Sequence, residues 1–138
     1  MKTMTAEDAP TTNRRILVVD DDLVLLDALE GAFKEAGDLK VVALANFEDA
    51  KRLLRSETFD VLITDVRLGA FNGLQLAVLA RDCNPAIQLI VFSGFDDPVL
   101  RQDADNLGAL YLIKPVMSSH LIDLIRGGAL PNQTSASE

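Results

Sequence analysis

The chain lacks the residues on which several classes of protein depend. Among 138 residues there is no tryptophan, one tyrosine, one histidine and one cysteine. The single Cys83 excludes an internal disulfide and a zinc site built from cysteines. Aromatic residues make up only 5% of the chain, so we expect an aliphatic core.

Basic residues are also in short supply. Lysine and arginine number 13 against 21 aspartates and glutamates, which gives a net charge of −8. Binding to nucleic acid or to an anionic membrane surface requires basic patches, so we expect neither partner for this domain. The acidic balance suits a protein with a cation site or a basic partner.

Long apolar runs are missing as well. No stretch approaches the ~20 apolar residues of a membrane-spanning helix, and residues 1–13 contain no hydrophobic segment typical of a signal peptide. We therefore expect a cytoplasmic location. The polar ends predict flexible tails at residues 1–13 and 129–138, on either side of one folded domain at residues 14–128.

Between those ends, apolar runs alternate with amphipathic segments. The runs are rich in Val, Ile and Leu and are continuous, which is typical of parallel strands buried on both faces. Helical spacing follows each run, with caps expected at Asn46, Asn72 and Asp97. Five such β–α units predict an α/β fold with a five-stranded, doubly wound parallel sheet, (βα)5. The predicted strands are Ile16–Asp20, Lys40–Leu44, Val61–Thr64, Ile87–Phe92 and Ala109–Ile113.

Charged residues stand where three of these strands end. Asp20, Asp21 and Asp22 mark the end of the first strand, Asp65 the third and Lys114 the fifth. In an open α/β sheet, ligands bind outside the carboxyl ends of the strands. Clustered carboxylates repel one another unless a cation or a basic group joins them. The sequence therefore predicts a charged site at this edge of the sheet.

Taken together and in order, these motifs resemble those of a response-regulator receiver domain of two-component signal transduction. The resemblance covers about Arg15 to Arg126 and implies the CheY-like, flavodoxin-like form of the fold. The motifs that carry it are Ile16–Asp21, Asp65 with Gly73 eight residues later, Ser93-Gly94, and Tyr111–Pro115.

The resemblance implies roles for the charged residues. Asp65 would be the phosphoacceptor, because a carboxylate can attack a phosphoryl group and form an acyl phosphate. Asp20, Asp21 and Asp65, with the backbone carbonyl of Arg67, would hold Mg²⁺ through oxygen ligands. Lys114 would stabilise the transferred group as a point charge.

Further roles follow from the same resemblance. The Ser93 hydroxyl would donate a hydrogen bond to a phosphoryl oxygen, and Tyr111 would be the aromatic ring of the switch. A cis peptide bond before Pro115 would aim the lysine into the site. Arg67 and Phe95 would border the path of attacking water, and their bulk would tune the lifetime of the phosphoryl group.

The chain departs from the family pattern after the phosphoacceptor. It has Leu68-Gly69 where the family commonly has Met-Pro, and a glycine there is expected to loosen the loop. Asp22 stands where the family usually has Glu or another polar residue, and a contact with the metal is not its main expected role. His120 is expected at the surface.

Partners and output are also implied. A histidine kinase or a histidine phosphotransfer protein would donate the phosphoryl group, as in a phosphorelay. Phosphorylation would switch the surface of the fourth helix, last strand and last helix, and so control a partner or an output domain. A homodimer through that surface is a further expectation. Such a domain is not an enzyme on other molecules, since it catalyses only its own phosphorylation and dephosphorylation.

Three alternatives stay open. A Mg²⁺-dependent aspartyl phosphatase or phosphotransferase also uses an aspartate at a strand end, but it needs a second aspartate two residues later, where this chain has Arg67. A nucleotide- or flavin-binding domain would need a glycine-rich loop after the first strand, where three aspartates stand. A degenerate receiver would act through protein contacts alone.

Overall fold

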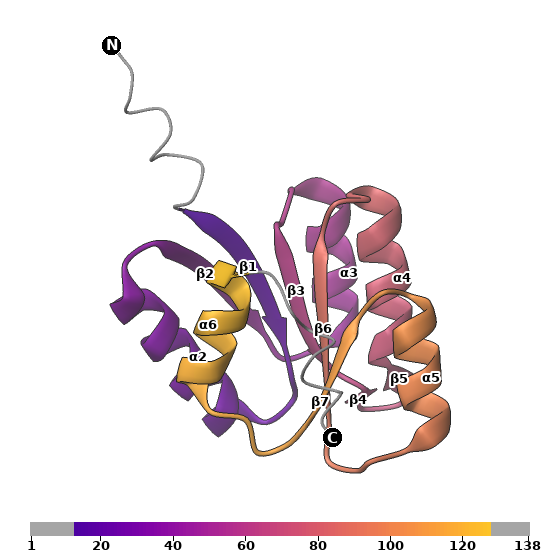
Figure 1. Ribbon diagram of the computed structural model, residues 1–138. Helices are drawn as coiled ribbons and strands as arrows, with labels where there is room; N and C mark the ends of the chain where they lie inside the picture. Colours follow the sequence, from indigo (N-terminus) through magenta and orange to yellow (C-terminus); the bar gives the residue numbers. More distant parts are fainter. Residues whose placement is uncertain (1–12, 128–138) are drawn as a thin grey trace.

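The computed structural model describes residues 13–127, so the tails expected at the two ends lie almost wholly outside the described residues. Five parallel strands form one sheet in the order β2-β1-β3-β6-β7 (Figure 1). The strands are β1 (Arg14–Val19), β2 (Leu39–Leu44), β3 (Val61–Asp65), β6 (Gln88–Ser93) and β7 (Leu110–Ile113).

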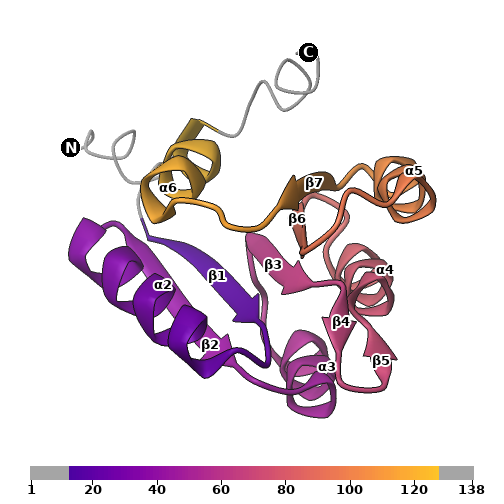
Figure 2. The same cartoon turned by 90° about the horizontal axis from the view of Figure 1, so that it is seen from below.

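Helices cover both faces of this sheet. Helices α2 and α6 lie on one face, and α3, α4 and α5 lie on the other (Figure 2). This arrangement confirms the prediction of a doubly wound (βα)5 fold. The helices are α2 (Leu23–Ala36), α3 (Phe47–Ser56), α4 (Gly73–Cys83), α5 (Pro98–Asn106) and α6 (Ser118–Gly127). None of the described helices is long and apolar enough to cross a lipid bilayer.

The helices begin where the capping residues predict. The side chains of Asn46, Asn72 and Asp97 each accept a hydrogen bond from a backbone N–H in the first turn of α3, α4 and α5. Each cap satisfies a donor that the helix itself leaves free, which contributes about 1 kcal/mol. The three predicted caps are therefore confirmed. They fix the residue at which each of these helices begins, after the strand that precedes it.

The core has two layers, one on each face of the sheet. Along β1, Ile16 and Val18 pack toward α2 and α6, whereas Leu17 and Val19 pack toward α3 and α4. All four side chains are fully buried, as their continuous apolar run predicts. The prediction of a purely aliphatic core is too simple. The few aromatic rings are concentrated inside, and those that are buried are Phe33, Phe47, Phe59, Phe92 and Tyr111.

One element was not predicted. After β3 the chain forms a small antiparallel hairpin from β4 (Arg67–Leu68) and β5 (Phe71–Asn72), joined by a two-residue turn in which Gly69 has a φ of +62°. Strands of two residues are too short to show a periodic pattern. Gly69 was expected to loosen this loop. The two halves of the loop instead pair with each other as β4 and β5.

Candidate functional site

The register of the sheet brings the acidic residues together. In the pairing of β1 with β3, Val18 lies beside Ile63 and Val19 beside Thr64. One step further along both strands, Asp20 and Asp65 are therefore neighbours at the edge where all five strands have their carboxyl ends. Asp20 is fully buried and Asp65 nearly so. We call this edge, at the lower end of Figure 1, the carboxyl edge.

Three carboxylates meet at the carboxyl edge. Asp20, Asp21 and Asp65 can each offer an oxygen atom so that the three atoms lie within 4.8 Å of one another. Asp22 serves a different purpose, because its side chain caps α2. Its own backbone N–H donates to Oδ1 of Asp20 at 2.9 Å, which fixes the orientation of that carboxylate.

Lys114 reaches this cluster from the end of β7. Its ammonium nitrogen lies 2.8 Å from Oδ2 of Asp20 and 3.5 Å from Oδ2 of Asp65. Its backbone N–H donates to the carbonyl oxygen of Ser93 at 2.8 Å, which ties the end of β7 to the end of β6. The peptide bond between Lys114 and Pro115 is cis.

The environment shifts the pKa of two of these groups. Burial raises the pKa of Asp65 above its ordinary value, and the negative charge of Asp20 adds to this effect, while Lys114 opposes it. A hydrogen bond from the backbone amide of Arg67 also favours the Asp65 carboxylate. Burial alone would lower the pKa of Lys114, but the hydrogen bond and charge of Asp20, with the charge of Asp65, outweigh it and raise that pKa.

The backbone after Asp65 is held closely. The Thr64 hydroxyl donates to the Asp65 carbonyl oxygen at 2.9 Å, and the Gly73 N–H donates to the Val66 carbonyl at 2.6 Å. A Cβ atom at Gly73 would lie 1.9 Å from the Asp65 carbonyl oxygen. Residue 73 must therefore be glycine for α4 to start against the end of β3. In the sequence this glycine stands out only as a family motif, and its structural role becomes visible in the fold.

Ser93 and Tyr111 hold the same loop residue. The buried Ser93 hydroxyl accepts a hydrogen bond from the Phe95 N–H at 3.1 Å. The Tyr111 hydroxyl donates to the Phe95 carbonyl oxygen at 2.8 Å, and the Tyr111 ring is only 7% exposed. The Ser93 side chain therefore binds the backbone N–H of Phe95, and the Tyr111 side chain binds its backbone carbonyl.

Two arginines cover this loop from outside. The guanidinium of Arg67 lies 5.5 Å from the centre of the Phe95 ring, which is 62% exposed. Arg101 lies 4.8 Å from the centre of the Tyr111 ring and pairs with Asp96 at 2.8 Å. Sequence reasoning identified Arg67 and Phe95 but missed Arg101, since nothing in the sequence distinguishes it from an ordinary arginine on a helix.

The donor set at the carboxyl edge fits a hard divalent cation. Carboxylate oxygens are the ligands that Mg²⁺ prefers. Oδ2 of Asp20 is buried and, among the described residues, has no partner besides the Lys114 ammonium. Three carboxylates facing one ammonium leave an excess of negative charge that a cation would offset. A carboxylate placed between an ammonium and such a cation can act as a nucleophile toward a phosphoryl group.

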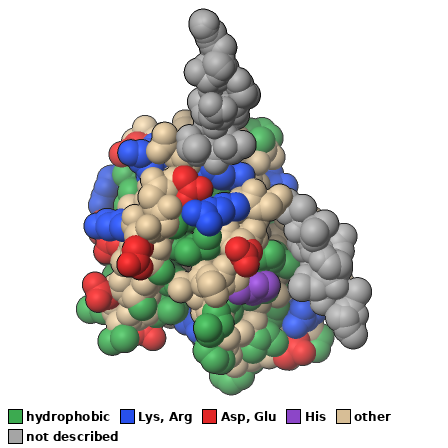
Figure 3. Space-filling view, turned by 60° about the vertical axis from the view of Figure 1, so that its left-hand side comes forward, with side chains coloured by type: hydrophobic (Ala, Val, Ile, Leu, Met, Phe, Trp, Pro, Cys, Tyr) green, Lys and Arg blue, Asp and Glu red, His purple; other side chains and the backbone are tan. Residues whose placement is uncertain are grey.

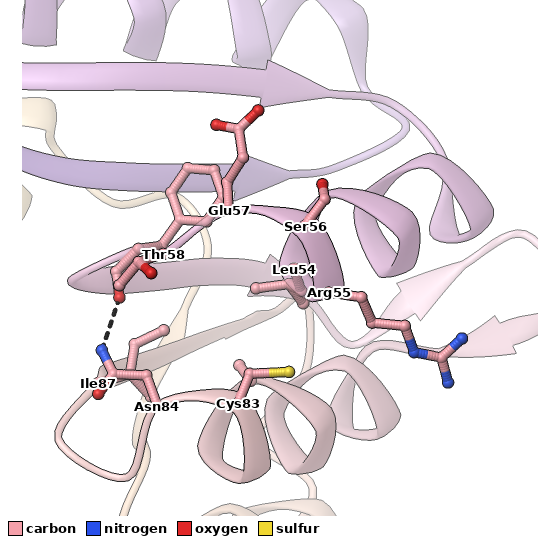
Figure 4. A pocket seen from close by; sticks show the side chains of 10 residues that line it. Leu54, Arg55, Ser56, Glu57, Thr58, Cys83, Asn84 and Ile87 are labelled. Atoms are coloured by element: carbon pink, nitrogen blue, oxygen red, sulfur yellow. Dashed lines mark hydrogen bonds between the residues drawn. The ribbon is translucent and has the colours of Figure 1, made fainter.

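A hollow lies at the opposite edge of the sheet (Figure 4). It encloses about 140 Å³ between the loops that precede β3 and β6. There Asn84 donates to the Phe59 carbonyl oxygen at 2.9 Å, and Glu57 pairs with Arg15. The Asn84 bond joins the two loops, and the Glu57 pair ties one of them to β1. Neither contact involves a cluster of carboxylates. The chemistry of the carboxyl edge therefore identifies the candidate site.

Comparison with known proteins places the chain among relatives of one kind. The family model described as the response regulator receiver domain matches residues 16–126. The chain is 30% identical to the hydrogenase transcriptional regulatory protein HoxA of Cupriavidus necator, over 80% of this chain and 23% of that protein. It is 34% identical to the transcriptional regulatory protein ZraR of Escherichia coli, over 75% of this chain and 24% of that protein. The chain thus spans about a quarter of the length of these relatives.

Solved structures share the fold. A response regulator protein from Burkholderia pseudomallei, crystallised with a phosphorylated aspartic acid and a calcium ion, matches with a TM-score of 0.80 and 25% identity, over 91% of this chain and 74% of that chain. A CheY-like receiver domain protein from Methanospirillum hungatei matches with a TM-score of 0.78 and 24% identity, over 92% of this chain and all of that chain.

Proposed function

Because the chain belongs to the response regulator receiver domain family, we propose that it accepts a phosphoryl group on Asp65 in the cytoplasm. The observation that carries this proposal is the position of Lys114, whose ammonium faces both Asp20 and Asp65. A carboxylate that must attack an anionic phosphoryl group needs positive charge beside it, and the ammonium supplies one such charge.

The transfer follows from this geometry. A carboxylate oxygen of Asp65 forms a bond to phosphorus while the bond from phosphorus to the donor's histidine nitrogen breaks, and its electron pair returns to the imidazole. Lys114 then pairs with an oxygen of the transferred group. The Ser93 hydroxyl leaves the Phe95 N–H and donates to another phosphoryl oxygen.

Mg²⁺ is the proposed cofactor. Asp20, Asp21 and Asp65, with the backbone carbonyl of Arg67, would hold it. The ion neutralises the charge that otherwise keeps a carboxylate and a phosphoryl group apart. Asp20 is oriented for this role by the backbone N–H of Asp22 and is fully buried, so it keeps its place when Lys114 moves.

The surface around the site supports a protein as the donor. Large hydrophobic side chains are exposed at the carboxyl edge. Figure 3 shows hydrophobic side chains gathered at the lower end of the molecule, where this edge lies. Exposed apolar groups that border a polar site are typical of a surface that binds another protein. We infer a histidine kinase or a histidine phosphotransfer protein. The exposed residues at the helix starts and on the loops after β6 and β7 are Leu23, Val24, Phe95, Val99 and Met117.

The proposed output would depend on the loop after β6. When Ser93 turns to the phosphoryl group, Phe95 loses one of its two backbone partners, and Tyr111 is attached to the other. Phosphorylation would therefore change the surface of α5, β7 and α6 by shifting an existing equilibrium. Control of a partner, of an output domain or of homodimer formation would act through this surface. The domain would catalyse no reaction except on its own phosphoryl group.

Intact-protein mass spectrometry tests the proposal. We expect one added phosphoryl group after incubation with a small acyl phosphate donor and Mg²⁺, and none for Asp65→Asn or with a chelator present. The matched control Asp82→Asn removes an exposed carboxylate on α4 and should react like the unchanged protein. Failure of the unchanged protein to react would overturn the proposal and favour a receiver that acts through contacts alone.

A further inference from the structure

The hairpin after Asp65 is fastened to a helix by two aromatic rings. Phe71 of β5 stacks on Phe47, the first residue of α3, with ring centres 4.5 Å apart and planes 9° from parallel. Phe47 is buried, whereas Phe71 is 43% exposed. The covered side of the Phe71 ring therefore rests on a buried ring of α3.

The stack adds a contact with α3 to the other contacts that hold the hairpin. Leu68 is buried in the core, and Asn72 caps α4 through the Leu74 N–H. Between these anchors lies the turn at Gly69, whose positive φ and missing side chain add little stiffness. Phe71 is the only side chain of the turn and β5 that the structure packs against an aromatic ring among the described residues.

The hairpin also carries a group that acts on the phosphoacceptor. Arg67 opens β4 and is paired with Asn72 across the hairpin. Its backbone amide lies near enough to the Asp65 carboxylate to lower the pKa of that group, and its carbonyl is the expected fourth oxygen of the cation site. A hairpin that tilts away from α3 would therefore move both backbone groups of Arg67 relative to Asp65.

We propose that Phe71 is a positioning residue, whose stack on Phe47 holds the hairpin so that Arg67 presents its backbone to the Asp65 carboxylate and to the cation. The inference rests on the proposed function of Asp65. The family commonly has a proline where this chain has Gly69, and a proline would stiffen the loop. In this chain the contact between Phe71 and α3 restrains the loop instead. The stack thereby raises the affinity for Mg²⁺ without taking part in the phosphoryl transfer.

Mg²⁺ titration calorimetry on the unphosphorylated protein tests this role directly. Losing an aromatic stack typically changes an equilibrium by about two- to tenfold. We expect Phe71→Ala to weaken Mg²⁺ binding by about that factor, while Phe71→Tyr, which keeps the ring, binds like the unchanged protein. In phosphorylation by a small donor, Phe71→Ala should need more Mg²⁺ for half-maximal rate yet reach a similar rate at saturation.

Matched variants separate this role from a general loss of stability. Phe47→Leu should weaken Mg²⁺ binding as Phe71→Ala does, and the two changes together should be no worse than either alone. Val78→Ala, which trims an exposed apolar residue of α4, should leave Mg²⁺ binding unchanged. Circular dichroism on each variant reports whether it is folded, and Phe71→Leu serves as the milder change.

The outcomes distinguish the two proposals. Equal Mg²⁺ affinity in Phe71→Ala, Phe71→Leu and the unchanged protein would overturn the positioning role and leave the proposed function intact. If the unchanged protein neither binds Mg²⁺ nor takes up a phosphoryl group, the proposed function fails and this inference fails with it. A lower rate for Phe71→Ala at saturating Mg²⁺ with unaltered affinity would also overturn the inference.

Discussion

The ammonium of Lys114 lies 2.8 Å from the fully buried carboxylate of Asp20. The same nitrogen is 3.5 Å from Asp65. Lys114 therefore neutralises the most buried charge of the site and also faces the Asp65 carboxylate. A buried carboxylate without a partner destabilises the folded state. The same ammonium therefore contributes both to the stability of the fold and to the charge of the site.

Removing this ammonium should destabilise the domain. We expect Lys114→Met to lower the free energy of unfolding by about 2 kcal/mol in metal-free buffer, since Asp20 then lacks its counter-charge. Adding Asp20→Asn to this variant should recover most of the loss. Urea denaturation of the unchanged protein, both single variants and the double variant measures the coupling. Strictly additive effects would contradict the pairing as the source of stability.

Asp65 should have the opposite effect on stability. Its pKa in the folded protein is raised by burial and by Asp20, so the folded state holds a proton to higher pH than the unfolded state does. The contribution of Asp65 to stability therefore falls as pH rises from about 3.8 through its folded-state pKa. Asp65→Asn should be more stable at pH 7 by on the order of 1 kcal/mol, and this gain should vanish below pH 3.8.

Denaturation at several pH values, in the presence of a chelator, checks this sign. Asp82→Asn is the control, because its carboxylate is exposed on α4 and should show no such gain. An Asp65→Asn variant that is less stable than the unchanged protein at pH 7 would show that Lys114 outweighs burial and Asp20 together.

Two glycines should respond in opposite ways to the same change. At Gly73 an added Cβ would lie 1.9 Å from the Asp65 carbonyl oxygen, whereas at Gly31, inside α2, nothing lies within 4 Å. Gly73→Ala should cost about 3 kcal/mol through overpacking and slow phosphorylation. Gly31→Ala should stabilise by about 1 kcal/mol because alanine favours helix. Thermal unfolding of both variants measures these changes in stability. A Gly73→Ala variant as stable as the unchanged protein would refute the close contact.

The stacked pair of Arg67 and Phe95 should protect the phosphoryl group. Both side chains are exposed beside the site, with the guanidinium 5.5 Å from the ring centre. We expect Arg67→Ala or Phe95→Ala to shorten the lifetime of phosphorylated Asp65 on the order of threefold, because a contact of this size shields the path of water. Mass spectrometry over time measures the decay. Arg52→Ala on α3 is the control, and unchanged lifetimes would end the hypothesis.

Much of this architecture is predictable from sequence for a physical reason. The apolar runs Ile16–Val19 and Val61–Ile63 are continuous because parallel strands here are buried on both faces. The charged residues that follow such runs must then lie at one edge. The capping side chains of Asn46 and Asp97 are equally local signals, since a cap acts on residues two or three positions away.

Contacts between distant segments could not be predicted in the same way. Phe71 meets Phe47, and Arg101 covers Tyr111, only after the sheet has placed their elements side by side. Neither pair is joined by a periodic pattern. The role of Gly73 was hidden too, because its close neighbour is a backbone oxygen of Asp65 rather than a side chain.

Fluorescence of Tyr111 can test the proposed switch, because the chain has no tryptophan and no other tyrosine. Its intrinsic fluorescence therefore reports a single ring, whose hydroxyl donates to the Phe95 carbonyl oxygen. We expect phosphorylation to change this emission, since Ser93 releases the N–H of the same residue. Tyr111→Phe should lower the free energy of unfolding by about 1 kcal/mol through the lost hydrogen bond, yet still accept a phosphoryl group.

Two further variants test whether the signal passes from Ser93 to Tyr111 through the backbone of Phe95. Ser93→Ala removes the acceptor of the Phe95 N–H, so its emission should respond less to phosphorylation even where mass spectrometry shows the added group. Arg101→Met removes the guanidinium 4.8 Å from the ring, which should alter the starting emission but keep the response. If Ser93→Ala responds as fully as the unchanged protein, the signal does not pass through Phe95, and Tyr111 must sense the phosphoryl group by another contact.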